Sequence, residues 1–130
     1  MQKEINVSQD YVSCINGKTC VGKHFLIDLY GARHLENESL LDNLLRKIIV
    51  AANATLLHIH LHKFGAEQGV TGVAVLAESH ISIHTWPERE YAAFDIFMCG
   101  KSQPESAIPI IEKYLLPQRM EVVEKLRGDL

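Results

Sequence analysis

The sequence predicts an α+β protein, a two-layer sandwich in which a mostly antiparallel sheet carries two helices on one face. Short apolar runs are separated by turn residues at hairpin length, which favours antiparallel strands. Two other segments carry apolar residues at helical spacing along one side only. One-sided helices bury that side against a sheet. With 130 residues and no repeat or linker, we expect a single domain over 1–130.

The strands are predicted from apolar runs and from alternation with a period of two. Residues 79–86 are the clearest case, because Ile81 and Ile83 alternate with polar and aromatic residues. Residues 1–20 are polar and mixed, and we expect a loosely held arm there with a turn at Asn16-Gly17. The predicted strands are 21–30, 55–64, 70–77, 79–86, 91–98 and 120–126.

The two helices are predicted from one-sided apolar spacing. The first contains leucines and isoleucines between residues 40 and 49, with charged residues on its other side. The second runs through Ile111, Tyr114 and Leu115, and Pro109 fits within it only in the first turn or at a kink. The residues expected to bound the helices are Asn37 or Ser39 at the start of the first, Ser102 or Ser106 at the start of the second, and Pro117 at its end.

Composition and charge exclude several classes of protein. Apolar residues make up 47% and charged residues 22%, and a net charge of -3 gives no basic surface for nucleic acid. No apolar run has the length of a membrane span, and the first residues lack a signal-peptide pattern. We therefore expect a cytoplasmic protein with neither a nucleic-acid nor a membrane partner. The odd count of three cysteines, Cys14, Cys20 and Cys99, favours free thiols.

Three histidines, His58, His60 and His62, alternate along the strand 55–64. Alternation places successive imidazoles on one face about 6.6 Å apart, and two of them with a third ligand would suit zinc. A polar strand face that meets solvent or a partner subunit explains the same pattern. No cysteine pair or well-spaced fourth ligand is present, so we expect no metal. The spacing of Cys14 and Cys20 fits no redox or zinc motif, and both are interpreted as incidental thiols.

Ser79, His84 and Cys99 form another candidate set, with Glu78 next to the serine. A Ser–His pair suits acyl transfer, but no orienting carboxylate and no Gly-x-Ser-x-Gly elbow accompany it. A Cys99–His84 pair would suit a thiolate nucleophile. Each residue also has a structural interpretation, as a turn serine, a sheet histidine and a small buried cysteine. Spacing alone leaves these interpretations open.

The run ESHISIHTWPE, with GVTGV before it and YAAFDIFMCG after it, closely resembles the prokaryotic S-adenosylmethionine decarboxylases. These are small pyruvoyl-dependent enzymes of spermidine synthesis. The resemblance is continuous from about Gly22 to Gly100 and looser beyond. There are departures: the turn 62–69 is one residue longer with Ala66 in place of a frequent proline, Glu90 replaces a usual glycine, and Thr71 replaces a serine.

The resemblance implies a proenzyme that cleaves itself between Glu78 and Ser79. The Ser79 hydroxyl would attack the Glu78 carbonyl, with Thr71 assisting by a hydrogen bond to the oxyanion. His84, expected on the same side as Ser79, would then take the α-proton of Ser79. Elimination and hydrolysis would convert Ser79 into a pyruvoyl group, the implied cofactor. The two resulting chains would be 1–78 and 79–130.

The resemblance also assigns the decarboxylation residues. The pyruvoyl group would form a Schiff base with the substrate amine and accept electrons as CO2 leaves. Cys99 matches the proton donor to the resulting carbon. Phe64 and Trp86 are candidates for adenine and sulfonium contacts, because a cation without donors binds aromatic faces. Glu88 resembles the acid that binds the ribose hydroxyls. Core packing for Trp86 and a solvated turn for Glu88 are the plain alternatives.

A sheet face without helices needs a cover, and the family implies a homodimer of processed protomers with sites near the interface. Three alternatives stay open. A pyruvoyl decarboxylase of the same fold acting on arginine or ornithine would share the processing residues, although Trp86 and Glu88 favour the nucleoside substrate. A binding homologue that never cleaves is disfavoured by the joint presence of Ser79, His84 and Cys99. A zinc hydrolase would use the histidine strand.

Overall fold

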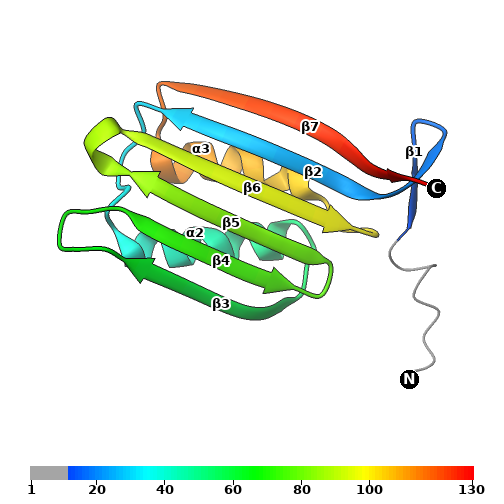
Figure 1. The fold of residues 1–130 in the computed structure, drawn as a ribbon, viewed down its shortest axis with the longest axis horizontal. Coiled ribbons are helices and arrows are strands. Elements are labelled where there is room, and N and C mark those ends of the chain that lie inside the picture. The colour runs from blue at the N-terminus through cyan, green and yellow to red at the C-terminus, as the bar shows by residue number, and fades with distance from the viewer. Residues whose placement is uncertain (1–11) are drawn as a thin grey trace.

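The computed structural model describes residues 12–130 and contains a seven-stranded sheet with both helices on one face (Figure 1). Across the sheet the order is β7, β2, β6, β5, β4 and β3, with β1 paired to the start of β2, and every pairing is antiparallel. The predicted sandwich is therefore confirmed. The strands are β1 (Ser13–Ile15), β2 (Lys18–Tyr30), β3 (Leu56–Lys63), β4 (Val70–Leu76), β5 (Ser79–Trp86), β6 (Tyr91–Cys99) and β7 (Arg119–Asp129).

The helices are α2 (Glu38–Ala51) and α3 (Ala107–Leu115). Asn37 caps α2, because its side-chain oxygen accepts a hydrogen bond from the backbone N–H of Leu40 at 3.0 Å. Ser106 precedes α3, and Pro109 lies in the first turn, where its missing N–H costs nothing. Among residues 12–130, neither helix has the length and apolar character that crossing a bilayer requires.

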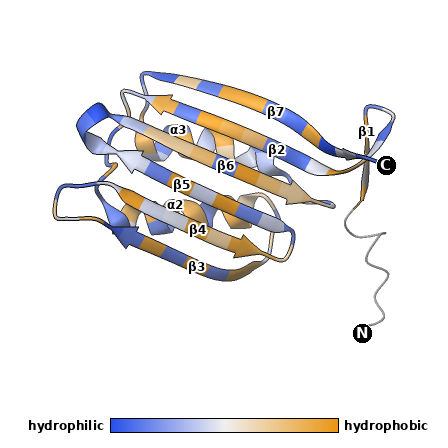
Figure 2. Ribbon diagram, in the orientation of Figure 1, coloured by the Kyte–Doolittle hydropathy of each residue, from blue (hydrophilic) through white to orange (hydrophobic). Residues whose placement is uncertain are grey.

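The core lies between the helices and one face of the sheet. In β5 the alternation places Ile81 and Ile83 on this side, and both are fully buried. The colouring in Figure 2 follows the same alternation of hydrophobic and hydrophilic residues along the strands. From α2, the core includes Leu41, Leu44, Leu45, Ile48 and Ile49.

Two expectations about the ends of the chain are wrong. Residues 13–20 do not form a loose arm: β1 and the start of β2 pair as a hairpin, while residues 1–11 lie outside the described part. The turn at Asn16-Gly17 is confirmed, and both residues adopt the positive φ values that a tight hairpin turn requires. The last strand is longer than predicted and pairs along almost all of β2.

The other face of the sheet, here called the open face, carries neither α2 nor α3 (Figure 1). Cross-strand pairing assigns alternate residues of every strand to it, including His24 of β2, Asp95 of β6 and His80 of β5. Several large hydrophobic side chains on this face are exposed, which is the usual mark of an interaction surface. They are Leu26, Val73, Val75, Trp86 and Val123.

Candidate active site

Glu78 and Ser79, the residues of the expected cleavage bond, lie where β4 turns into β5. The Glu78 carboxylate accepts hydrogen bonds from the backbone N–H of Thr55 at 2.8 Å and from its hydroxyl at 3.1 Å. The Glu78 carbonyl oxygen accepts two more, from the backbone N–H of Cys99 at 3.0 Å and from its thiol at 2.9 Å. Both polar ends of Glu78 are therefore held in place before any chemistry occurs.

Ser79 has an unusual backbone conformation, with a φ of 151°. Residues with a side chain rarely adopt this region, and such strain costs about 1–3 kcal/mol. Ser79 is also the first paired residue of β5, opposite Leu76 in β4 and Met98 in β6. The pairing on both sides holds the strained conformation. Cleavage of the peptide bond before Ser79 would relax it.

Burial raises the pKa of the Cys99 thiol above its ordinary value; a hydrogen bond from Ser79 lowers it in part, and the charge of Glu78 raises it. The net direction is upward, so the thiol keeps its proton at neutral pH and can donate it. Gly22 of β2 pairs with Cys99. A Cβ at Gly22 would lie 2.3 Å from the carbonyl oxygen of Met98, so glycine allows β2 to approach β6 this closely.

His84 and Thr71 form a second group, with the Thr71 hydroxyl 3.1 Å from His84 Nδ1. Both line a hollow of about 970 Å³, together with the predicted binding residues Phe64, Trp86 and Glu88. That volume suits a small-molecule ligand. Trp86 is 41% exposed, so core packing is not its role. The other lining residues are Ala66, Glu67, Gln68, Gly69 and Thr85.

Two residues that sequence reasoning missed, Thr85 and Gly69, shape this hollow. The buried Thr85 hydroxyl accepts a hydrogen bond from the Val70 N–H and donates one to the Leu35 carbonyl, both at 2.8 Å. A Cβ at Gly69 would lie 2.1 Å from the Thr85 carbonyl oxygen, so a larger residue would push the two segments apart. The sequence did contain a signal for Thr85, because it is a polar residue at a position where the alternation of β5 predicts a buried side chain.

The structure does not bring the two groups together within one chain. His84 is five residues beyond Ser79 in β5, which is about 16 Å of strand. Within a single chain, His84 is therefore too far from Ser79 to take its α-proton. Thr71 pairs with His84 at one end of the β4–β5 ladder, whereas Leu76 pairs with Ser79 at the other end. The first group is Glu78, Ser79 and Cys99, and the second is Phe64, Thr71, His84, Trp86 and Glu88.

Other candidates from the sequence stay outside both groups. His58, His60 and His62 are exposed on the edge strand β3. They do not belong to the single set of converging metal-type ligands found within residues 12–130. Cys14 and Cys20 are free thiols, as expected. A further hollow on the outer side of α2 and α3 contains none of the predicted site residues.

Comparison with known proteins places the chain in one family. Residues 23–128 match the family model described as S-adenosylmethionine decarboxylase. The chain is 49% identical over 111 residues to an S-adenosylmethionine decarboxylase proenzyme of Methanococcus maripaludis, covering 83% of this chain and 90% of that protein. It is 41% identical over 109 residues to the proenzyme of Thermomicrobium roseum, covering 83% and 94%. The crystal structure of the adenosylmethionine decarboxylase from Aquifex aeolicus matches with a TM-score of 0.77 at 36% identity, covering 85% of this chain and 93% of that one.

Proposed function

The chain belongs to the S-adenosylmethionine decarboxylase family, and from that premise we propose how its residues produce and use a pyruvoyl cofactor. It is an S-adenosylmethionine decarboxylase proenzyme, a carboxy-lyase. The proposal is that it cleaves itself between Glu78 and Ser79 and that the cofactor derives from Ser79. The observation that carries the proposal is the doubly hydrogen-bonded carbonyl of Glu78 next to a strained serine.

Cleavage begins when the Ser79 hydroxyl attacks the Glu78 carbonyl carbon, which replaces the amide with an ester through an oxyanion. The N–H and the thiol of Cys99 already contact the oxygen on which that charge develops. Donors held in place in this way need no rearrangement as the charge forms. The carboxylate of Glu78 stays bound to Thr55, which fixes the carbonyl side of the bond. The strain at Ser79 favours the step that breaks its peptide bond.

Removal of the Ser79 α-proton requires a base, and His84 of the same chain is too far away. We infer that a second copy supplies it. Two copies packed open face against open face, related by a twofold axis, would place the Thr71–His84 end of one over the Ser79–Cys99 end of the other. Symmetry would then generate two complete sites. The exposed hydrophobic residues of the open face, Val73 and Val123 among them, would be covered in this homodimer.

The bound cofactor supplies an electrophilic carbonyl that captures the substrate amine and accepts electrons when CO2 leaves. The chain's own residues do the rest. Cys99 keeps a proton at neutral pH and donates it to the substrate carbon, because burial raises its pKa. The aromatic faces of Phe64 and Trp86 suit the sulfonium cation and the adenine ring, and Glu88 suits the ribose hydroxyls. These three residues favour a nucleoside substrate over arginine or ornithine.

The proposal is tested by intact mass measurement of the purified chain, followed by assays of CO2 release from S-adenosylmethionine, arginine and ornithine. We expect two chains that break between Glu78 and Ser79, with pyruvate at the start of the second, and CO2 from S-adenosylmethionine alone. Ser79→Ala is the matched control and should remain uncut. A wild-type chain that stays uncut would contradict self-cleavage, and CO2 from arginine or ornithine alone would contradict the assigned substrate.

A further inference from the structure

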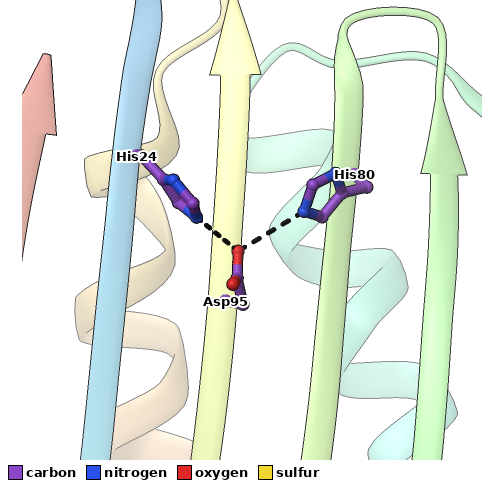
Figure 3. Close-up of side chains that lie close together, drawn as sticks. All are labelled: His24, His80 and Asp95. Carbon is purple, nitrogen blue, oxygen red and sulfur yellow. Dashed lines mark hydrogen bonds and ion pairs between the residues drawn. The ribbon is translucent and has the colours of Figure 1, made fainter. Parts of the chain in front are cut away.

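Outside both groups, three polar side chains converge on the open face: His24 of β2, Asp95 of β6 and His80 of β5 (Figure 3). Asp95 Oδ1 lies 2.5 Å from His24 Nε2 and 3.4 Å from His80 Nε2. The three come from neighbouring strands, so the carboxylate stands between the two imidazoles. The rings of both histidines also contact Phe97, which limits their rotation.

Two histidines and a carboxylate with ligand atoms within 4.8 Å of one another would suit a metal ion. Arg127 of β7 opposes that interpretation, because its guanidinium lies 2.9 Å from His24 Nδ1. A guanidinium only donates, so Nδ1 must accept and the ring proton must sit on Nε2. That nitrogen then has no lone pair for a metal and donates to Asp95 instead. The contacts describe a hydrogen-bonded chain that runs Arg127–His24–Asp95–His80.

This series of hydrogen bonds ends at His80, the residue that follows Ser79. After cleavage, His80 becomes the second residue of a new chain, and new chain ends fray unless side chains hold them. The ladder bonds of His80, opposite Val75 in β4 and Phe97 in β6, hold its backbone but not its side chain. The contact with Asp95 adds a fixed point one residue from the cofactor.

We propose that this chain of contacts, here called the β5 clamp (Arg127, His24, Asp95 and His80), positions the pyruvoyl-bearing end of the second chain against the Cys99 thiol. The inference rests on the proposed function, since it concerns the end that cleavage creates. His80 and Asp95 are positioning residues: they touch neither the carbonyl of Glu78 nor the thiol. The clamp acts on proton delivery, because a donor displaced by about 1 Å loses much of its effect.

Misplacement of the pyruvoyl-bearing end should change the reaction products as well as slow the turnover. Correct delivery gives the proton from Cys99 to the substrate carbon that lost CO2. Delivery to the former cofactor carbonyl carbon, followed by attack of water, releases the substrate skeleton as an aldehyde and leaves its amine on residue 79 as alanine. The mass of the second chain distinguishes alanine from pyruvate at that position. A loosened clamp should therefore raise the alanine fraction accumulated per turnover.

The experiment compares Asp95→Ala, Asp95→Asn and His80→Gln in the full-length chain, with His58→Ala as the control for removal of a histidine on β3. For Asp95→Ala we expect cleavage to proceed, KM to stay close to wild type and kcat to fall about 10- to 100-fold. We also expect more alanine at residue 79 and faster hydrogen exchange at residues 80–82. Asp95→Asn, whose amide oxygen still accepts a hydrogen bond, and His80→Gln, whose amide N–H2 reaches about as far as Nε2, should each keep most of the wild-type kcat.

Normal kcat and no extra alanine in Asp95→Ala would overturn the clamp while leaving the proposed function intact. If Asp95→Ala does not fold, the same outcome in His80→Ala, which removes the contact with Asp95 at its more exposed end, decides. Stoichiometric zinc in wild type that is lost in Asp95→Ala would overturn the clamp in favour of a metal site. A wild-type chain that neither cleaves nor releases CO2 would overturn the proposed function and the clamp together.

Discussion

Cys99 contacts the carbonyl oxygen of Glu78 with both of its donors, the backbone N–H at 3.0 Å and the thiol at 2.9 Å. The pairing of β2 with β6 sets the position of the backbone donor, while the buried thiol adds a second donor from the same residue. We propose that this one residue at the end of β6 both activates the carbonyl that is attacked and later protonates the substrate. The two tasks separate in mutants, because only the thiol is lost on substitution.

Cys99→Ala should slow self-cleavage without abolishing it and should abolish productive decarboxylation. The backbone N–H remains on the Glu78 carbonyl, and loss of one oxyanion donor typically costs about 100- to 1000-fold in rate. Cys99→Ser keeps a donor and should cleave faster than the alanine variant. Intact mass over time measures cleavage, and CO2 release measures turnover of the cleaved fraction. Equal cleavage rates in the two variants would contradict a role for the side-chain donor.

The rate of self-cleavage should be insensitive to Cys99 ionisation at neutral pH. A thiol is neutral below its pKa and negative above it, and burial raises that pKa in the uncleaved chain. The S–H donor should therefore persist past the ordinary thiol pKa of about 8.5, and be lost only at higher pH. The ratio of wild-type to Cys99→Ser cleavage rates, measured across pH, isolates this group. A fall in that ratio already between neutral pH and the ordinary thiol value would contradict the upward shift.

Thr85→Val should destabilise the protein and impair substrate binding more than chemistry. Valine fills the same space but leaves the buried N–H of Val70 and the carbonyl of Leu35 without their partner, at about 1–3 kcal/mol for each group. Chemical denaturation measures the loss, and KM reports on the hollow. Thr85→Ser, which keeps the hydroxyl, is the matched control and should retain most of the lost stability. Equal effects of both substitutions would point to packing in place of hydrogen bonding.

The sequence predicted the six strands after β1, both helices and the layer arrangement, because alternation and one-sided spacing are local signals. Pairing order is not local: nothing in residues 119–129 reveals that β7 lies beside β2. The site was predicted as a residue list but not as a geometry. His84 and Ser79 are close in sequence, and only the extended strand between them shows that they lie near opposite ends of β5. The conformation of Glu90, at a φ of 52°, also explains the usual glycine there.

Mixed dimers provide the sharpest test of a site shared between two copies. In a hybrid of Ser79→Ala and His84→Ala subunits, one site combines the intact Ser79 and Cys99 of the His84→Ala subunit with the intact His84 of the Ser79→Ala subunit. The other site lacks both. Each variant alone should stay uncut and inactive, whereas the hybrid should cleave only the His84→Ala chain.

Two affinity tags allow the hybrid to be purified away from the parent dimers, and a mass difference between subunits identifies the chain that is cut. With one complete site of two, the hybrid should reach about half of wild-type activity. A hybrid of Ser79→Ala and Cys99→Ala subunits is the control. Ser79 and Cys99 of one site come from the same subunit, so one site of this hybrid lacks Ser79 and the other lacks Cys99. Cleavage of the His84→Ala chain by itself would contradict the role of His84, and an uncut hybrid would contradict the shared site.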